Sequence, residues 1–393
     1  MNKQDRIIMN AKIVMPDGIV EGGWLRVEEG RVAEIGDKTT LDLNRQKDLE
    51  WLDAENGWLL PGFIDVHVHG GAGYDFMDVD TQGIGEISRF HAQHGTTGLL
   101  ATSLTAPKAD ISSMLRGVSE YMSEPMPYAQ VWGAHLEGPF INEEWKGGQN
   151  GQYAIVPQLA WLEEWVSDFP GIIRIQTLAP ELDGALVYID RLVAHGIVPS
   201  CGHTDATFDQ IKEAADRGLR HAVHAFNAMR PFHHREPGTV GAVLTDDRIM
   251  AEVIADGHHV HPAGLRLLQK VKGTDRIILV TDAILAAGHE DGEYVLGGLP
   301  VVMSCGIARL KSSGNLAGST LTMIDAFRNM IRETGLSIEE ASKMASVNPA
   351  KQIGLADVTG SLKQGLRADL IQLSPALELR RVWIGGIPLS MHG

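Results

Sequence analysis

Histidines and carboxylates recur along this sequence at positions that suit the binding of a divalent metal. Six of them lie at or just after the end of a short apolar run: His67, His69, Glu137, His203, His224 and Asp282. His67 and His69 are two residues apart, so in an extended strand both imidazoles point to the same face. Buried imidazoles lose their contact with water, and a divalent cation can replace it. The pattern therefore predicts a metal site that could support hydrolysis.

The neighbouring residues suggest a role for each of the other four. Glu137 precedes a Gly-Pro pair, a turn that would hold its carboxylate at the mouth of a site. A metal ligand, a general base and a loop cap are the alternatives for Glu137, and we favour the ligand. His203 and His224 are predicted to bind metal as neutral imidazoles, with Cys201 as an alternative ligand. Asp282 is predicted to act as general base and acid, or instead to cap the next helix.

These side chains need a fold that brings distant segments together. Eight apolar runs alternate with helix-like stretches, and the runs cover residues 63–69, 97–103, 131–137, 172–178, 197–203, 220–224, 250–255 and 276–282. Such runs are typical of parallel strands covered on both faces. Eight βα repeats favour an α/β fold, the (β/α)8 TIM-type barrel, with a doubly wound open sheet as the alternative. Five runs end in metal-competent or acidic residues, and a barrel brings all strand ends to one face. His135 and His221, on the same runs, are expected to be structural.

The two ends of the chain have a different character from the middle. Short β-prone runs separated by turn formers occupy residues 7–35, and similar runs cover residues 369–373 and 381–384. We therefore expect residues 1–56 and 360–393 to form one small β domain, in which both ends share a sheet. Residues 57–359 would then form the barrel.

Composition narrows the class of protein. The 393 residues carry a net charge of −16 and show no basic stripe, so a nucleic-acid partner is not expected. No apolar run reaches the roughly 18 residues of a membrane helix, and the first residues lack the apolar core of a signal peptide. Two cysteines, Cys201 and Cys305, argue against a disulfide framework. A cytoplasmic protein without a membrane partner is expected.

Longer motifs resemble those of the amidohydrolase superfamily and, within it, the N-acetylglucosamine-6-phosphate deacetylase family. The resemblance runs over nearly the whole chain and is carried by residues 61–71, 135–140, 202–204, 224–229, 233–238, 255–260, 280–283 and 316–323. The His-x-His motif marks only the superfamily. The segments His-Arg-Glu-Pro-Gly, Asp-Gly-His-His and Ala-Gly-Ser-Thr-Leu are more specific to sugar-phosphate deacetylases.

The resemblance implies a β-sandwich built from both chain ends beside the barrel. It also implies that Glu137, His203 and His224 hold one divalent cation, which could be zinc, iron, cobalt or manganese. Some members of the family replace the two histidines of the first strand and keep a single metal. This chain retains His67 and His69, which leaves one or two metals per subunit.

The same resemblance places the contacts to an amino-sugar phosphate. The implied positions are Gly148, Gln149, Asn227, Ala228, Arg235, His259, Leu316, Ala317 and Gly318. Some members carry His where this chain has Gln149, which can donate a hydrogen bond but cannot supply a proton. The family is dimeric, and Arg235 is expected to reach the phosphate of the neighbouring subunit. A surface ion pair between Arg235 and Glu236 is the alternative.

Together these features predict the hydrolysis of N-acetylglucosamine 6-phosphate to glucosamine 6-phosphate and acetate, in amino-sugar catabolism. Asp282 would take a proton from water that the metal has acidified and later deliver it to the leaving nitrogen. Gln149 and the metal would stabilise the oxyanion. The alternatives are the same reaction on N-acetylgalactosamine 6-phosphate, a cyclic-amide hydrolase of the same superfamily, and a non-catalytic binding barrel.

Overall fold

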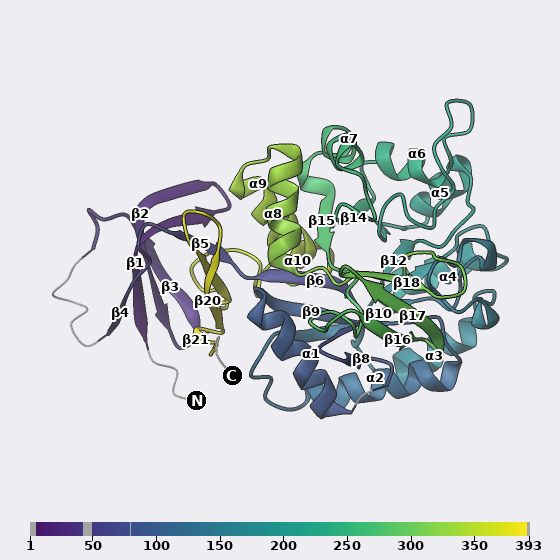
Figure 1. Cartoon of the computed structure of the whole chain (residues 1–393), viewed down its shortest axis with the longest axis horizontal. Helices are drawn as coiled ribbons and strands as arrows, with labels where there is room; N and C mark the ends of the chain where they lie inside the picture. Colours follow the sequence, from purple (N-terminus) through teal and green to yellow (C-terminus); the bar gives the residue numbers. More distant parts are fainter. Residues whose placement is uncertain (1–4, 42–48, 79, 391–393) are drawn as a thin grey trace.

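The computed structural model describes residues 5–41, 49–78 and 80–390. Figure 1 shows two units, a small group of strands from the first and last parts of the described chain and a larger group of alternating strands and helices. Among the described residues, no helix is both long enough and apolar enough to cross a membrane.

Eight parallel strands form the larger unit, and neighbours in the sheet are also neighbours in the sequence. The strands are β6 (Phe63–Val68), β9 (Thr96–Ser103), β10 (Gln130–Glu137), β11 (Ile173–Leu178), β12 (Val198–Cys201), β13 (His221–Ala222), β14 (Met250–Ile254) and β15 (Ile277–Val280). The first and last strands meet, because the Asp282 amide donates to the His67 carbonyl at 2.9 Å and Val68 bridges Ala283. The sheet is therefore a nearly closed barrel. The predicted barrel is confirmed and the open sheet is wrong.

Each predicted run overlaps one of these strands, but several strands end earlier than predicted. β6, β12, β13 and β15 stop one or two residues before the polar residue that follows them. As a result His69, His203, His224 and Asp282 lie in the loops just beyond the barrel rather than on it. The carboxyl ends of the strands form one face, where these loops meet.

Helices cover the outside of the barrel. They are α1 (Thr81–Gln93), α2 (Lys108–Met122), α3 (Leu159–Asp168), α4 (Ala185–Ala194), α5 (Phe208–Asp216), α6 (Gly238–Thr245), α7 (Pro262–Lys272), α8 (Met323–Thr334), α9 (Ile338–Ser342) and α10 (Asn348–Gln352). Of these helices, α5 begins at Phe208 because Thr207 and Gln210 form a capping box.

A small antiparallel sheet is inserted between β15 and α8. It comprises β16 (Gly292–Leu296), β17 (Leu299–Ser304) and β18 (Ile307–Leu310), and the sequence analysis did not predict it. The sheet buries its own apolar face against the barrel mouth, where Leu296, Val301 and Met303 pack against Leu104 and Ile284. A two-stranded ribbon, β7 (Gly70–Gly71) and β8 (Tyr74–Asp75), lies in the loop after β6.

The strands from the two chain ends form one sheet, shown in purple and yellow in Figure 1. Its strands are β1 (Arg6–Met15), β2 (Gly18–Glu28), β3 (Arg31–Gly36), β4 (Glu50–Asp53), β5 (Trp58–Pro61), β19 (Leu370–Leu373), β20 (Leu379–Ile384) and β21 (Ile387–Pro388). β5 pairs with β1 on one side and with β19 on the other. The predicted sharing of a sheet is confirmed.

The limits proposed for the two domains stay a prediction. Residues 1–4, 42–48 and 391–393 of the terminal domain lie outside the described part of the chain. Within the described part, hydrogen bonding places β5 in the terminal sheet, although it follows residue 56, and the chain then continues almost directly into β6.

His91 on α1 makes the stability of the barrel depend on pH. The side chain is fully buried, and its Nε2–H donates to the Gly70 carbonyl at 2.9 Å. Burial lowers the pKa of His91 to about 4, although the hydrogen bond to Gly70 opposes this shift. The unfolded chain, with a histidine pKa of about 6.5, therefore binds this proton first as the pH falls. The contribution of neutral, buried His91 to the free energy of unfolding is therefore complete above pH 6.5 and is lost as the pH falls from 6.5 to about 4.

The variant His91→Gln keeps a hydrogen-bond donor but cannot titrate. We expect the free energy of unfolding of the parent chain to fall more than that of the variant between pH 7.5 and pH 5. The expected difference is about 2 kcal/mol. Urea unfolding of both proteins at the two pH values measures it. An equal loss in both proteins would contradict the assignment of this effect to His91.

Candidate active site

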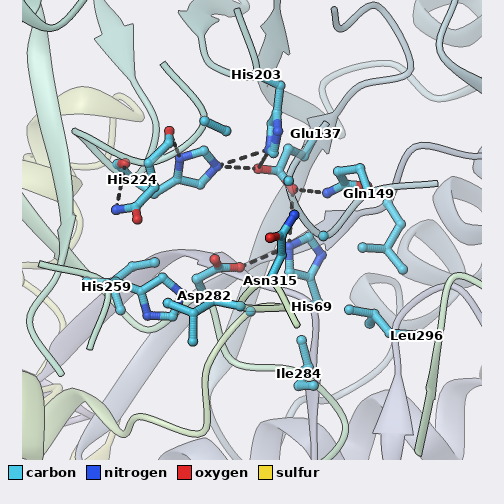
Figure 2. Close-up of a pocket in the computed structure, with 18 of the residues that line it drawn as sticks. His69, Glu137, Gln149, His203, His224, His259, Asp282, Ile284, Leu296 and Asn315 are labelled. Carbon is cyan, nitrogen blue, oxygen red and sulfur yellow. Dashed lines mark hydrogen bonds and ion pairs between the residues drawn. The ribbon is translucent and has the colours of Figure 1, made fainter. Parts of the chain in front are cut away.

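A cavity of about 500 Å³ opens at the carboxyl ends of the barrel strands. Twelve of the residues singled out in the sequence line it: His69, Glu137, Gly148, Gln149, His203, Asn227, His224, Ala228, His259, Asp282, Leu316 and Gly318. Figure 2 shows most of these side chains pointing toward one another across the cavity. His67 lies directly beneath, fully buried, against the same carboxylates.

Glu137, His203 and His224 form the first group that could hold a metal. Glu137 Oε1 lies 3.1 Å from His203 Nε2 and 2.9 Å from His224 Nε2, and the two Nε2 atoms are 3.1 Å apart. The Nδ1 atoms of the two rings lie 3.0 Å from the Trp145 carbonyl and 3.2 Å from the Asn227 carbonyl. A carbonyl can only accept, so each neutral ring carries its proton on Nδ1.

This tautomer leaves both Nε2 atoms without a proton. Two nitrogen lone pairs and a carboxylate oxygen then point at one small volume, with no hydrogen among them to hold them together. Such an arrangement is repulsive unless a cation occupies the volume, and imidazole and carboxylate are ordinary ligands of divalent ions. The chemistry of the donor set therefore fits a divalent metal.

His67, His69 and Asp282 form a second group beside the first. Asp282 Oδ1 lies 3.2 Å from His69 Nε2 and 3.6 Å from His67 Nε2. Glu137 reaches into this group as well, with Oε2 3.3 Å from His69 Nε2 and Oε1 3.3 Å from His67 Nε2. The carboxylate of Glu137 thus lies between two positions that a cation could take.

The carboxylates give the cavity floor a strongly negative field. Burial alone would raise the pKa of Glu137, but His67 and His203 outweigh it and hold that pKa well below its ordinary value. Burial likewise opposes the charging of His69, yet Asp282 and Glu137 raise its pKa to about 9. A site that raises the pKa of a buried imidazole attracts positive charge, whether a proton or a metal ion, and the two compete for the same nitrogen.

Gln149 is held against Glu137 in one orientation. Its side-chain oxygen accepts from the Thr105 amide at 2.7 Å, so its nitrogen must face Glu137, where it donates to Oε2. Gln149 therefore helps to fix the carboxylate, a contact that the sequence analysis did not anticipate. The second hydrogen of its amide group is left to meet a substrate.

Backbone conformation at the strand ends directs these side chains. His203, His224 and Asp282 have positive φ angles of 49°, 30° and 50°. Left-handed backbone at a residue with a side chain costs on the order of 1–3 kcal/mol and tends to gather at functional sites. Each of these residues follows a barrel strand, so the unusual turn directs its side chain across the mouth instead of along the strand.

Two predicted contacts lie outside the cavity lining. Arg235 is exposed on the loop before α6, which projects from the barrel in Figure 1, and its Nη1 lies 2.8 Å from His234 Nε2. The alternative surface pair with Glu236 is not among the ion pairs of the described residues. Ala317 is buried and supports the lining through its amide, which donates to the Ala308 carbonyl. Cys201 is buried in the core and belongs to neither metal group.

Some residues at the site were missed in the sequence. Glu252 on β14 is fully buried and contacts His67, and the signal was a lone charge within an apolar run. Arg309 and Leu296 come from the inserted sheet, Asn315 from a loop and Trp145 from a three-residue 3-10 helix, and segments this short show no periodicity from which they could be predicted. The structural role expected for His135 agrees with its contacts, because its nitrogens lie 2.9 Å from the Val66 carbonyl and 2.8 Å from the Thr177 hydroxyl.

Comparisons with known proteins give the family of the chain. A model described as "Amidohydrolase family" matches residues 58–388. An N-acetylgalactosamine-6-phosphate deacetylase of Escherichia coli O157:H7 is 38% identical over 97% of this chain and 98% of its own length. An N-acetylglucosamine-6-phosphate deacetylase of Vibrio furnissii is 40% identical over 84% of this chain and 82% of its own.

A solved structure is similar over almost the full length. It is a variant of the N-acetyl-D-glucosamine-6-phosphate deacetylase of Mycobacterium smegmatis in complex with N-acetyl-D-glucosamine 6-phosphate. It is 33% identical, covers 98% of this chain and 99% of its own, and superposes with a TM-score of 0.92. The chain therefore belongs to the amidohydrolase family and, within it, to the N-acetylglucosamine-6-phosphate deacetylase family.

Proposed function

We propose that this protein hydrolyses the acetamide of N-acetylglucosamine 6-phosphate to glucosamine 6-phosphate and acetate, as a step in amino-sugar catabolism. The observation that carries the proposal is the meeting of a metal-binding group and an ionised Asp282 in one cavity that also holds most of the sugar contacts implied by the family. Similarity to deacetylases of two epimeric sugar phosphates, over 97% and 84% of this chain, supports the same reaction class.

Glu137, His203 and His224 would hold the first cation, and His67, His69 and Asp282 a second, each being zinc, iron, cobalt or manganese. A bound divalent cation lowers the pKa of its water far below that of bulk water, to about 7, and polarises a carbonyl.

Asp282 moves the proton. Burial would raise its pKa, but in the metal-free site the protonated imidazoles of His67 and His69 outweigh burial and lower that pKa. A cation held in place of their protons would supply positive charge at the same position, so the carboxylate is ionised and can accept a proton at neutral pH. It takes the proton of the attacking water and returns it to the sugar nitrogen as the C–N bond breaks. Gln149 donates its remaining amide hydrogen to the oxyanion of the tetrahedral intermediate.

The phosphate is assigned to His259 within the chain and to Arg235 of a second subunit. His259 lines the cavity, and Asp256 Oδ2 lies 2.6 Å from its Nδ1. Arg235 is exposed on its projecting loop, and its planar fork suits a phosphate group.

An apolar groove of about 390 Å³ lies beside that loop and is lined by Phe226, Pro231, Phe232, Leu267 and Val271, among others. Phe232 is 59% exposed there. A second copy of the chain would cover this groove in a homodimer and carry Arg235 toward the neighbouring cavity.

We place the protein in the cytoplasm, in keeping with two free cysteines.

N-acetylgalactosamine 6-phosphate is the second candidate substrate, on the evidence of the relative from Escherichia coli. An acetate-release assay on both sugar phosphates, each with and without chelator, tests the proposal. We expect faster release from the gluco epimer, loss of release with chelator and recovery on adding a divalent metal. Faster release from the galacto epimer would reverse the assignment, and chelator-resistant release would contradict the metal chemistry.

The variant Asp282→Asn removes the proton acceptor at constant size. We expect kcat to fall by about 10²–10⁴-fold, because general acid–base catalysis contributes about this much, with a smaller change in KM. The matched control is Glu144→Gln, which alters an exposed carboxylate at the rim of the same cavity and should leave kcat unchanged. A variant that retains parental kcat would exclude Asp282 as the acid and base.

The variant Arg235→Ala should raise KM for the phosphorylated sugar far more than for the unphosphorylated one. If Arg235 serves the neighbouring subunit, co-expression of Arg235→Ala and Asp282→Asn chains should restore activity. A mixed dimer then has one cavity free of both changes, which makes roughly a quarter of all sites intact in an equal mixture.

The control for this complementation pairs Asp282→Asn with Gln149→Ala. Both residues line the cavity of their own chain, so each mixed dimer has two defective sites and no activity should return. Absence of recovery in the Arg235 mixture would place Arg235 in its own subunit. An equal rise in KM for both sugars would argue for a cyclic-amide hydrolase without a phosphate site.

A further inference from the structure

Glu252 is a buried carboxylate that the proposed reaction does not use. It lies on β14 between apolar neighbours and is 0% exposed. Removing a carboxylate from water is costly unless donors surround it, so a charge at this position requires specific partners. Two imidazoles and the backbone of the site supply them.

The partners of Glu252 come from β6, from β13 and from the loop just after β13. Its Oε2 lies 2.8 Å from His67 Nδ1 and 3.3 Å from the amide nitrogen of His224, while its Oε1 lies 2.6 Å from His221 Nε2. The two shortest contacts join a carboxylate to imidazole nitrogens and are charge-assisted hydrogen bonds. Glu252 thus ties one residue from each metal group to the same strand.

These contacts decide which nitrogen of His67 carries the proton. An ionised carboxylate can only accept, so the hydrogen of His67 lies on Nδ1. In the neutral ring Nε2 then bears a lone pair, and it has no hydrogen-bond partner among the described residues. It faces Glu137 Oε1 at 3.3 Å and Asp282 Oδ1 at 3.6 Å, both of which are acceptors too.

The contact between Glu252 and His67 matters more to the second metal group than any single side-chain contact matters to the first. His203 and His224 are each oriented by a backbone carbonyl, which no side-chain substitution removes. In the second group, the Nδ1 atom of His69 is buried without a hydrogen-bond partner in the described chain. His67 is therefore the imidazole of this group whose Nδ1 atom is held by a hydrogen bond, and Glu252 is the partner in that bond.

We propose that Glu252 is the positioning residue of the second metal position, which it creates by holding the Nε2 atom of His67 toward Asp282 and Glu137. Removing the carboxylate frees the ring and lowers its basicity. A carboxylate behind a metal-bound histidine typically changes metal affinity by about 10–100-fold. The first position keeps its own orienting contacts and is expected to be unaffected.

The test is a titration of the metal-stripped protein with Zn²⁺ against a chromophoric chelator. The parent chain should take up two ions in separate steps. In Glu252→Gln the weaker step should lose about 10–100-fold in affinity while the tighter step is unchanged. Circular dichroism of the stripped proteins verifies that both are folded.

His221→Gln is the matched control. It changes the other hydrogen-bond partner of Glu252 at an equally buried position, and glutamine can still donate to the carboxylate. Because the contact between Glu252 and His67 survives, this variant should keep both steps. Equal weakening of the second step in both variants would show general disruption of the core and would overturn the proposal.

A double variant tests whether Glu252 acts through His67. Once His67→Asn has removed the imidazole, adding Glu252→Gln should weaken the second step no further. Additive losses would overturn the proposal, as would a parent chain that binds a single ion. If Glu252→Gln does not fold, Glu252→Asp replaces it, because the shorter side chain keeps the charge but withdraws the carboxylate from His67. The second step should again weaken while the first is unchanged, and two unchanged steps would overturn the proposal.

This inference rests on the proposed metal chemistry, but the two fail in different ways. A parent chain that binds no zinc would refute both. A parent chain that binds two ions and releases no acetate would refute the proposed reaction and leave the role of Glu252 intact. Two unchanged steps in Glu252→Gln, with acetate release in the parent chain, would refute only the role of Glu252.

Discussion

The structure holds three acceptor atoms so close together that they repel one another unless a cation lies between them. At the mouth of the barrel, Glu137 Oε1 and the Nε2 atoms of His203 and His224 lie within 3.1 Å of one another. Backbone carbonyls hold the protons of both rings on the far side. The folding of the rest of the chain supplies the energy that keeps these acceptors together, and a bound cation would return part of it. The fold therefore favours metal binding before any substrate is considered.

Closure of the barrel makes this arrangement stiff. The hydrogen bond from the Asp282 amide to the His67 carbonyl joins the last strand to the first, so the two residues move together. Left-handed backbone at His203, His224 and Asp282 is tolerated because the strands on either side are fully paired and packed. Glu252 adds a connection below the site, because its carboxylate joins His67 on β6 to His221 on β13, two strands that are not neighbours in the sheet.

Much of the fold and part of the site could be predicted from the sequence. The eight apolar runs predicted the eight strands, because parallel strands buried on both faces tolerate few polar residues. The polar residues after the runs predicted which side chains would meet. The inserted sheet β16–β18 was missed because its strands are short and half exposed, and with it Arg309 and Leu296. Glu252 was missed because alternation alone does not say whether a lone carboxylate faces a barrel interior.

The direction of a loop could not be read from the sequence either. Arg235 belongs to a segment with a specific motif, yet it lies outside the cavity lining, on a loop that projects from the barrel. We infer that Arg235 acts on the substrate of a second molecule, and the spacing of residues in the sequence does not carry this information. The exposed apolar groove beside it is the feature from which we infer that completion.

The central claim is that three acceptors without a proton between them create a cation site. Anomalous scattering from zinc-soaked crystals, collected on both sides of the zinc absorption edge, tests it most directly. The account predicts a peak about 2.0–2.2 Å from Glu137 Oε1 and from the Nε2 atoms of His203 and His224. A crystal with no peak there, in which the two rings have turned to donate to Glu137, would contradict it.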